Sequence, residues 1–237
     1  MSRYIFQLSK EHFFPPVQQA QSSGLLAFGG DLDPNRLLLA YKRGIFPWYS
    51  EGQPILWFAP NPRYVLFPSK FSVQRSLKKV VKQRKFEITI DKNFAEVIQN
   101  CSTVSRPKQF GTWITEDMRS AYINLHKLGI AHSFETWKEG VLVGGLYGIV
   151  INGFFAGESM FAHEDDASKV AFVWAVEQLQ RWGVELIDCQ VQTQHLQRFG
   201  AENIPRDQYM SLLQQAQTKQ GCVFQTAFDA DFFPKMM

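Results

Sequence analysis

Apolar and polar residues follow regular patterns along most of the chain beyond residue 62. Alternating positions predict strands, and stripes with a period of about 3.6 residues predict helices. The pair Asn152-Gly153 is a strong signal for a hairpin turn. We expect strands at 86–90, 132–137, 141–150, 154–160 and 184–191, and helices at 93–100, 115–128, 168–182, 193–199 and 206–218. Strands interleaved with helices and hairpins predict an α/β fold, with an α+β mixed sheet.

The chain up to residue 62 has a different pattern. Asp33 is suited to cap a helix that begins at Pro34 and ends at Gly44. Residues 47–62 contain four prolines among several aromatic rings, which predicts irregular, tightly packed backbone. We therefore expect a small N-terminal domain over residues 1–62 and a larger domain over 63–237.

Composition narrows the class of protein. The 237 residues are 45% apolar and 14% aromatic, enough for a sizeable core and unlike a disordered chain. No apolar run approaches the roughly 20 residues of a membrane span, and the N-terminus has no signal-peptide pattern. Cys101, Cys189 and Cys222 are too scattered for a disulfide framework, which fits a reducing cytoplasm.

Charge is distributed unevenly, although the net charge is only +3. Seven basic residues and no acidic one occur between Lys70 and Lys85. Helical spacing places Val73, Leu77, Val80 and Val81 on one face of this segment and Arg75, Lys78, Lys79, Lys82 and Lys85 on another. A solvated surface helix is one interpretation. Because a face of single sign repels itself, binding to a phosphate backbone is the other.

Several common kinds of site are not indicated. The five histidines have no metal-ligand spacing, and His163-Glu164-Asp165-Asp166 reads equally well as a polar turn. The glycine pairs Gly29-Gly30 and Gly144-Gly145 match no phosphate-binding loop. Gly157-Glu158-Ser159 supplies only half of a serine-hydrolase elbow.

Polar residues in two predicted strands point to chemistry. Asp188 and Gln190 would share one face of the strand 184–191, where buried polar groups need partners. Ala156, Glu158 and Met160 would likewise share a face of the strand 154–160, and an acid beside a Met could hold an amine next to an apolar pocket. A satisfied structural pair and a surface Glu are the alternatives for the two strands.

Seven stretches in order give a more specific indication. They are GLLAFGGDLDPNRLLLAYKRGIFPWYS, ILWFAPNPR, GTWITEDMRSAY, HSFETWKEGVLVGGLYG, FAGESMF, ASKVA and LIDCQVQTQHLQRFGAENIPR. With them the chain resembles the leucyl/phenylalanyl-tRNA–protein transferase family over roughly 200 residues, whereas the tail after about residue 219 matches poorly. The resemblance implies an acetyltransferase-like (GNAT-like) larger domain.

It also implies an aminoacyltransferase that moves Leu or Phe, and Met more weakly, from tRNA to the free α-amine of a protein with N-terminal Arg or Lys. The product would carry a signal for degradation. The implied partners are Leu-tRNA, Phe-tRNA and the acceptor protein, with no membrane and with the enzyme a monomer. No ATP, metal or coenzyme A is expected.

The resemblance assigns roles to individual residues. Trp48 and Trp113 would flank the terminal adenosine of the tRNA, with Tyr41 nearby, and Glu158 would hold the aminoacyl α-amine. Asp188 and Gln190 match the catalytic pair, and the basic helix fits the acceptor stem. The side-chain pocket would be lined by Leu146, Met160, Ala175 and Leu179. Relatives can have Met and Phe at positions 146 and 175, which affects the preference between Leu and Phe.

Two other functions stay open. A coenzyme-A-dependent N-acetyltransferase needs a glycine-containing turn for pyrophosphate, but residues 162–167 contain no Gly and three acids. A non-enzymatic RNA-binding protein would explain the basic helix and the rings, but not Glu158, Asp188 and Gln190. It predicts tRNA binding that is indifferent to the attached amino acid.

Overall fold

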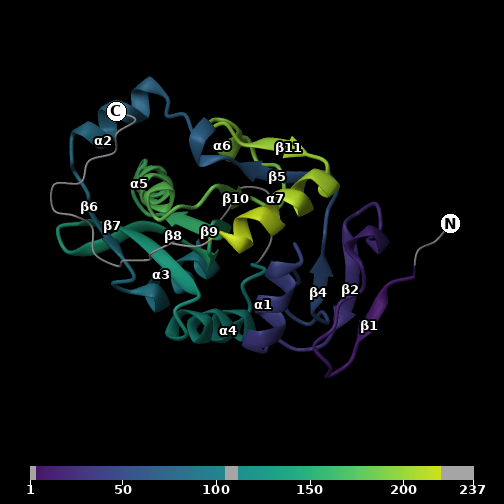
Figure 1. Cartoon of the computed structure of the whole chain (residues 1–237). Helices are drawn as coiled ribbons and strands as arrows, with labels where there is room; N and C mark the ends of the chain where they lie inside the picture. Colours follow the sequence, from purple (N-terminus) through teal and green to yellow (C-terminus); the bar gives the residue numbers. More distant parts are fainter. Residues whose placement is uncertain (1–3, 105–111, 220–237) are drawn as a thin grey trace.

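The computed structural model describes residues 4–104 and 112–219, which form a mixed α/β fold with two sheets (Figure 1). Gly111 and Cys222 lie outside the described residues. The elements in chain order are β1 (Phe6–Leu8), η1 (Val17–Gln19), β2 (Leu25–Gly29), α1 (Pro34–Lys42), β3 (Phe46–Pro47), β4 (Leu56–Phe58), β5 (Arg63–Leu66), η2 (Pro68–Lys70), α2 (Arg75–Lys82), β6 (Glu87–Ile90), α3 (Phe94–Thr103), α4 (Glu116–Lys127), β7 (Ala131–Lys138), β8 (Val141–Ile151), β9 (Phe154–Ala162), α5 (Ala167–Arg181), β10 (Leu186–Asp188), α6 (Gln194–Gln197), β11 (Glu202–Ile204) and α7 (Arg206–Thr218).

The smaller sheet has the order β1-β2-β4-β3. Residues 47–62 are thus less irregular than their prolines predict, because β4 pairs with both β2 and β3. Trp57 in β4 is fully buried, and its indole N–H donates to the carbonyl of Gly29 over 2.9 Å. The sheet therefore fixes the backbone that leads into Trp48.

The larger sheet has the order β11-β5-β10-β9-β8-β7-β6. β7, β8 and β9 correspond to three predicted strands and form an antiparallel meander, and Asn152 takes the left-handed conformation (φ 50°) in the expected hairpin turn. β9 and β10 are parallel and pair only through Phe154–Leu186, Phe155–Ile187 and Ala156–Asp188. Beyond that point β9 continues to Ala162 without β10 beside it.

Helix ends follow the predicted signals. The Asp33 carboxylate accepts the backbone N–H of Asn35 at the start of α1, and the Thr115 hydroxyl accepts that of Met118 at the start of α4. Gly44 and Gly129 follow the two helices with positive φ. The predicted helices at 93–100, 168–182, 193–199 and 206–218 are all present as α3, α5, α6 and α7.

The predicted strand 184–191 is much shorter than its apolar pattern indicates. β10 ends at Asp188, and Gln190 has a left-handed backbone (φ 56°) that no regular strand contains. The regular strand therefore ends at Asp188, although Cys189 and Gln190 still form backbone hydrogen bonds with Tyr64 in β5.

Two apolar clusters cover the two faces of the larger sheet. α5 packs on one face together with α2, and α3 and α4 pack on the other (Figure 1). The cluster on the face with α3 and α4 also contains buried residues of the smaller sheet, such as Leu26 and Trp57. The sheets fall on either side of residue 62, and the division into domains 1–62 and 63–237 stays a prediction.

Candidate active site

A large cavity opens where β9 and β10 part. It has a volume of about 1040 Å³ and receives residues from the smaller sheet, from β8 and β9, and from the chain after β10. Of the residues predicted from the sequence, it is lined by Trp48, Trp113, Leu146, Glu158, Met160, Asp188 and Gln190. A parting of two parallel strands thus brings together residues from both faces of the sheet.

Glu158 lies at a β-bulge. Tyr147 pairs with Ser159 and Gly148 pairs with Gly157, so Glu158 is an extra residue in β9. The bulge changes the alternation of side chains: Ala156 belongs to the cluster on the α4 face, whereas Met160 packs against the cluster on the α5 face. The prediction that Ala156, Glu158 and Met160 share one face is therefore wrong for Met160.

Two tyrosine hydroxyls hold the Glu158 carboxylate. Tyr41 donates to Oε1 over 2.7 Å, Tyr122 donates to Oε2 over 3.1 Å, and the two hydroxyls also contact each other. Burial raises the pKa of Glu158 to about 7, although both tyrosine hydrogen bonds oppose the rise. Burial and the nearby Glu158 keep the pKa of each tyrosine well above its ordinary value, so both stay protonated donors.

Asp188 is fully buried, and each of its two carboxylate oxygens accepts two hydrogen bonds. Its Oδ1 accepts Arg63 Nε at 2.8 Å and the backbone N–H of Gln190 at 2.9 Å. Its Oδ2 accepts Arg63 Nη2 at 2.6 Å and the Tyr209 hydroxyl at 2.9 Å. Four donors fill the acceptor capacity of a carboxylate. This arrangement makes Asp188 an anchor for its neighbours rather than a free base.

Arg63 is as buried as its partner. Its guanidinium lies over the rings of Phe46 and Tyr209, 4.7 Å from each ring centroid. Burial disfavours the charge, yet Asp188 raises the pKa of Arg63 above its ordinary value. The pair thus ties β5 to the end of β10.

Gln190 reaches the cavity from a loop, not from the face of a strand. Its backbone N–H donates to Asp188, and its carbonyl accepts the N–H of Tyr64 over 3.3 Å. Its side-chain Nε2 donates to Glu158 Oε1 over 3.4 Å. The structure therefore brings Asp188 and Gln190 together as predicted, but through the left-handed turn after β10.

The apolar wall differs in part from the predicted set. Leu146 and Met160 line the cavity as expected. Ala175 and Leu179 belong to α5. Both are fully buried in the core and are not among the residues that line the cavity. Phe172 of α5 and Ile187 of β10 also line the cavity.

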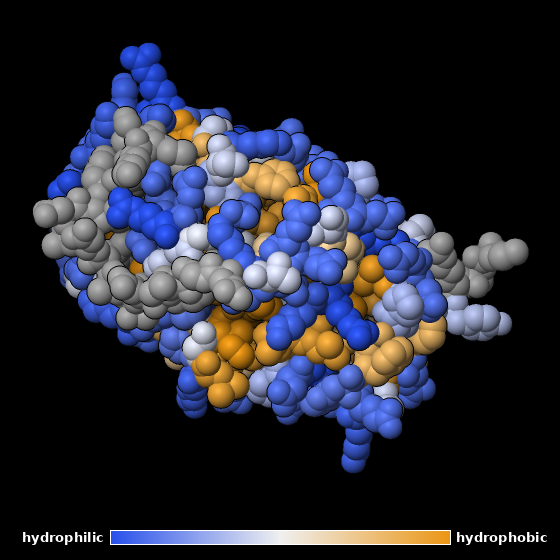
Figure 2. All heavy atoms as spheres, in the orientation of Figure 1, coloured by the Kyte–Doolittle hydropathy of each residue, from blue (hydrophilic) through white to orange (hydrophobic). Residues whose placement is uncertain are grey.

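The predicted aromatic residues divide into two groups. Trp48, which is 43% exposed, and the partly buried Trp113 line the cavity mouth. Tyr41 is fully buried and reaches the site through its hydroxyl on Glu158. Figure 2 shows patches of exposed apolar residues among hydrophilic ones on the face of the molecule that is in view.

The basic segment forms a helix that is shorter than its pattern. In α2, Leu77 and Val81 are buried, Val80 is partly buried, and Val73 precedes the helix. Arg75, Lys79 and Lys82 are exposed and Lys78 is partly buried. Lys85 lies beyond the end of α2, with its Nζ 4.7 Å from the ring centroid of Phe86.

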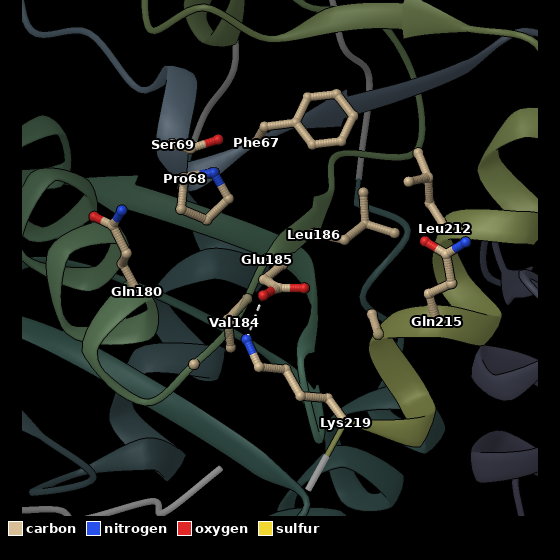
Figure 3. Close-up of a pocket in the computed structure, with 12 residues that line it drawn as sticks. Phe67, Pro68, Ser69, Gln180, Val184, Glu185, Leu186, Leu212, Gln215 and Lys219 are labelled. Atoms are coloured by element: carbon tan, nitrogen blue, oxygen red, sulfur yellow. Dashed lines mark hydrogen bonds and ion pairs between the residues drawn. The ribbon is translucent and has the colours of Figure 1, made fainter. Parts of the chain in front are cut away.

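Two further kinds of feature are absent from residues 4–104 and 112–219. No group of three or more His, Cys, Asp or Glu side chains there could hold a metal ion. No helix in the same ranges is both long and apolar enough to cross a membrane. A second cavity of about 420 Å³ lies between Phe67, Leu186 and Leu212, and Lys219 donates to Glu185 at its edge (Figure 3).

Sequence reasoning missed several residues of the site. Arg63 ends the quoted stretch ILWFAPNPR and Tyr122 ends GTWITEDMRSAY, but neither stretch reveals what its last residue contacts. Arg63 is 125 positions from Asp188, and Tyr122 is 36 positions from Glu158. Only the three-dimensional arrangement joins them.

Known proteins resemble this chain over most of its length. A family model described as leucyl/phenylalanyl-tRNA protein transferase matches residues 65–214, and the model of its N-terminal domain matches residues 30–61. A protein of Myxococcus xanthus named leucyl/phenylalanyl-tRNA–protein transferase is 58% identical over 90% of this chain and 92% of its own length. One of the same name from Azotobacter vinelandii is 56% identical over 84% and 89%.

A likeness to solved structures is much weaker. A GCN5-related N-acetyltransferase from Kribbella flavida is 10% identical and has a TM-score of 0.37, covering 72% of this chain and 60% of its own. The acetyltransferase-like arrangement of the larger sheet stays a prediction, while the mixed α/β class is confirmed by the sheets and helices themselves.

Proposed function

The chain belongs to the leucyl/phenylalanyl-tRNA–protein transferase family, and we propose that it transfers Leu or Phe, and Met more weakly, from aminoacyl-tRNA to proteins with N-terminal Arg or Lys. The observation that carries this proposal is the cavity in which Glu158, held by two tyrosines, lies beside Gln190 and an apolar wall. A carboxylate for an amine next to a wall for an apolar side chain matches an aminoacyl ester.

The donor ester would occupy the cavity in three parts. Glu158, in its charged form, accepts the α-ammonium of the aminoacyl group. Leu146, Met160, Phe172 and Ile187 surround its side chain, and Trp48 and Trp113 stack on the terminal adenine at the mouth. Tyr41 and Tyr122 act through Glu158, because their hydroxyls fix both carboxylate oxygens.

The reaction needs alignment more than activation, because an aminoacyl ester is already reactive. The neutral α-amine of the acceptor attacks the ester carbonyl, a C–N bond forms, and the C–O bond to the ribose breaks. The proton of the amine leaves and the ribose oxygen receives one, so no ATP is consumed. Holding the reactants together supplies several kcal/mol.

Gln190 is the group best placed to position the attacking amine. Its side-chain oxygen accepts a hydrogen bond from that amine, while its Nε2 stays on Glu158. Asp188 acts through the backbone N–H of Gln190, which it holds in the left-handed turn. We therefore assign Asp188 a positioning role and Gln190 contact with substrate.

Donor selection would follow from the shape of the apolar wall. Leu and Phe are unbranched at Cβ, whereas Ile and Val would push a methyl group into the wall. One misplaced methyl group changes transition-state binding by only about 1–3 kcal/mol, so discrimination is real but modest.

The nucleic acid and the protein acceptor complete the proposal. The exposed cations of α2 fit the phosphates of the tRNA acceptor stem. The enzyme acts as a monomer in the cytoplasm, where aminoacyl-tRNA is made, and its product carries an N-terminal signal for degradation.

The test uses purified protein, radiolabelled Phe-tRNA and a peptide that begins with Arg, without ATP or coenzyme A. A matched peptide has an acetylated N-terminus. We expect label on the free-amine peptide alone. Tight tRNA binding without transfer would favour a non-enzymatic RNA-binding protein, and dependence on coenzyme A would favour an N-acetyltransferase.

A further inference from the structure

α6 contributes His195 and Leu196 to the cavity lining, and the chain directly after α6 contacts the segment that leads into α2. The N–H of Ser72 donates to the carbonyl of Phe199 over 3.1 Å. The rings of Phe71 and Phe199 stack with centroids 5.6 Å apart, and both pack edge-on against Phe172 in the cavity wall. α6 and the start of α2 are therefore neighbours, joined behind the cavity by three aromatic rings.

Arg198 lies on the surface where α6 and the start of α2 meet, directly before Phe199. It is exposed, and no described residue pairs with its guanidinium or accepts a hydrogen bond from it. Nearby cations are engaged: Lys70 is 2.6 Å from Glu202, and Lys169 is 2.6 Å from Asp166. Arg198 thus carries an uncompensated positive charge where its neighbours do not.

His195 of α6 lies at the cavity, three residues before Arg198 in the sequence. The imidazole lines the cavity, and its buried Nε2 has no hydrogen-bond partner among the described residues. Burial lowers the pKa of His195, and the charges of Lys169 and Arg198 lower it further. The lowered pKa favours the neutral form of the imidazole, and the exposed guanidinium of Arg198 follows close to the cavity wall.

In the proposed function the tRNA extends from the cavity to α2, and this surface adjoins both sites. The segment from Ser72 to Arg75 covers at most about 11 Å, so Arg198 is within a short distance of the first cation of α2. A guanidinium offers a planar pair of donors that matches a phosphate. On the basis of the proposed function, we infer that Arg198 binds a phosphate of the single-stranded CCA end of tRNA, between the adenosine in the cavity and the acceptor stem on α2.

A series of donors of increasing length tests this inference. Phenylalanyl-adenosine has no phosphate, phenylalanyl-CCA adds the single strand, and a phenylalanyl minihelix adds the acceptor stem. We expect Arg198→Gln to lower kcat/KM for phenylalanyl-CCA and for the minihelix by about three- to tenfold, and to leave phenylalanyl-adenosine unchanged. Arg198→Lys should recover part of the loss, because it keeps the charge but not the planar pair.

Two matched variants locate the effect. Lys127→Gln removes an exposed cation at the end of α4 and should change no donor. The triple variant Lys78→Gln, Lys79→Gln and Lys82→Gln should weaken the minihelix but not phenylalanyl-CCA. This separates the acceptor stem from the CCA end.

Two results would overturn the inference: equal kcat/KM for phenylalanyl-CCA in Arg198→Gln and the parent enzyme, or an equal loss with phenylalanyl-adenosine. Binding of an uncharged, fluorescent CCA-ended minihelix gives a readout without transfer. If the parent enzyme transfers from no donor, the proposed function fails, and unaltered minihelix binding by Arg198→Gln would still reject the phosphate contact independently.

Discussion

Asp188 and Arg63 form a fully buried ion pair with two hydrogen bonds, 2.8 Å and 2.6 Å long, at the floor of the cavity. The pair lies where the larger sheet releases the chain toward Gln190. It gives Asp188 two separable tasks, because the same carboxylate balances a buried charge and holds the turn that presents Gln190.

Asp188→Asn should reveal both tasks. It leaves the Arg63 charge without a partner, so we expect the free energy of unfolding to fall by about 3–5 kcal/mol in denaturant titrations. We also expect a single-turnover rate at least about tenfold lower at saturating aminoacyl-tRNA, with donor affinity nearly unchanged. A full single-turnover rate in Asp188→Asn would contradict the positioning role.

The double variant Arg63→Met with Asp188→Leu separates stability from activity. Replacing both charges by apolar groups should restore most of the lost stability. The turn at Gln190 would still lack its acceptor, so transfer should stay slow. If the double variant regains the rate, the carboxylate matters for folding alone.

Glu158 should give donor binding a pH dependence. With its pKa at about 7, the carboxylate gains charge between pH 6 and pH 8 and then attracts the donor α-ammonium. We expect affinity for an amide-linked phenylalanyl-adenosine analogue to increase from pH 6 to pH 7.5, and Glu158→Gln to weaken it about tenfold and flatten this increase. An analogue without the α-amine, bound equally by both proteins, is the control.

The same group should affect stability with the opposite sign. Its folded-state pKa lies above the ordinary value of 4.5, so it favours folding below pH 4.5 and that contribution is lost as the pH rises through 7. Glu158→Gln should therefore be about 1–2 kcal/mol more stable than the parent at pH 8, and no more stable at pH 4. Urea titrations at both pH values measure this, and a Glu158→Gln protein less stable at pH 8 would refute it.

Phe172 should influence the choice between donor tRNAs more than those residues of α5 that are buried in the core. Phe172→Leu shortens the cavity wall, so we expect preference for Leu-tRNA over Ile-tRNA to fall from about 10–100-fold toward a few-fold in direct competition. Leu179→Met conserves volume in the core behind the wall and should leave the ratio unchanged. Equal transfer of Leu and Ile by the parent enzyme would show that the shape of the cavity wall does not select the donor.

The basic helix should appear in the salt dependence of tRNA binding. Each phosphate contact that is lost reduces the slope of log K against log salt by about 0.9. Lys78→Gln, Lys79→Gln and Lys82→Gln together should reduce the slope by nearly three and weaken all tRNAs alike. An unchanged slope would show that α2 does not contact the tRNA.

Local features of the fold were predictable from the sequence, whereas features set by pairing between distant segments were not. The caps at Asp33 and Thr115 and the turn at Asn152 depend on residues within three positions, so their signals are complete in the sequence. The end of β10 at Asp188 depends on β5 and β9. Its apolar neighbours alone extend the predicted strand to residue 191.

The candidate site shows the same division. Glu158, Asp188 and Gln190 stand out as polar residues in apolar surroundings, and the structure places all three at one cavity. The resemblance places Ala175 and Leu179 in the wall, whereas in the structure both are buried in the core and Phe172 is the apolar residue of α5 that lines the cavity. Packing against the sheet decides which side of a helix faces the cavity. The pattern of residues along that helix alone does not show this.

The bulge in β9 makes the site depend on the length of the strand as well as on its residue types. Removing Gly157 would let β8 and β9 pair without interruption, with Glu158 in the place of Gly157 opposite Gly148 and its side chain on the other face of the strand from Ala156. Such a deletion keeps Glu158 in the chain and improves the ladder, yet it takes the carboxylate away from Tyr41 and Tyr122. Relatives that differ by one residue within this strand are therefore expected to lose the reaction before they lose the fold.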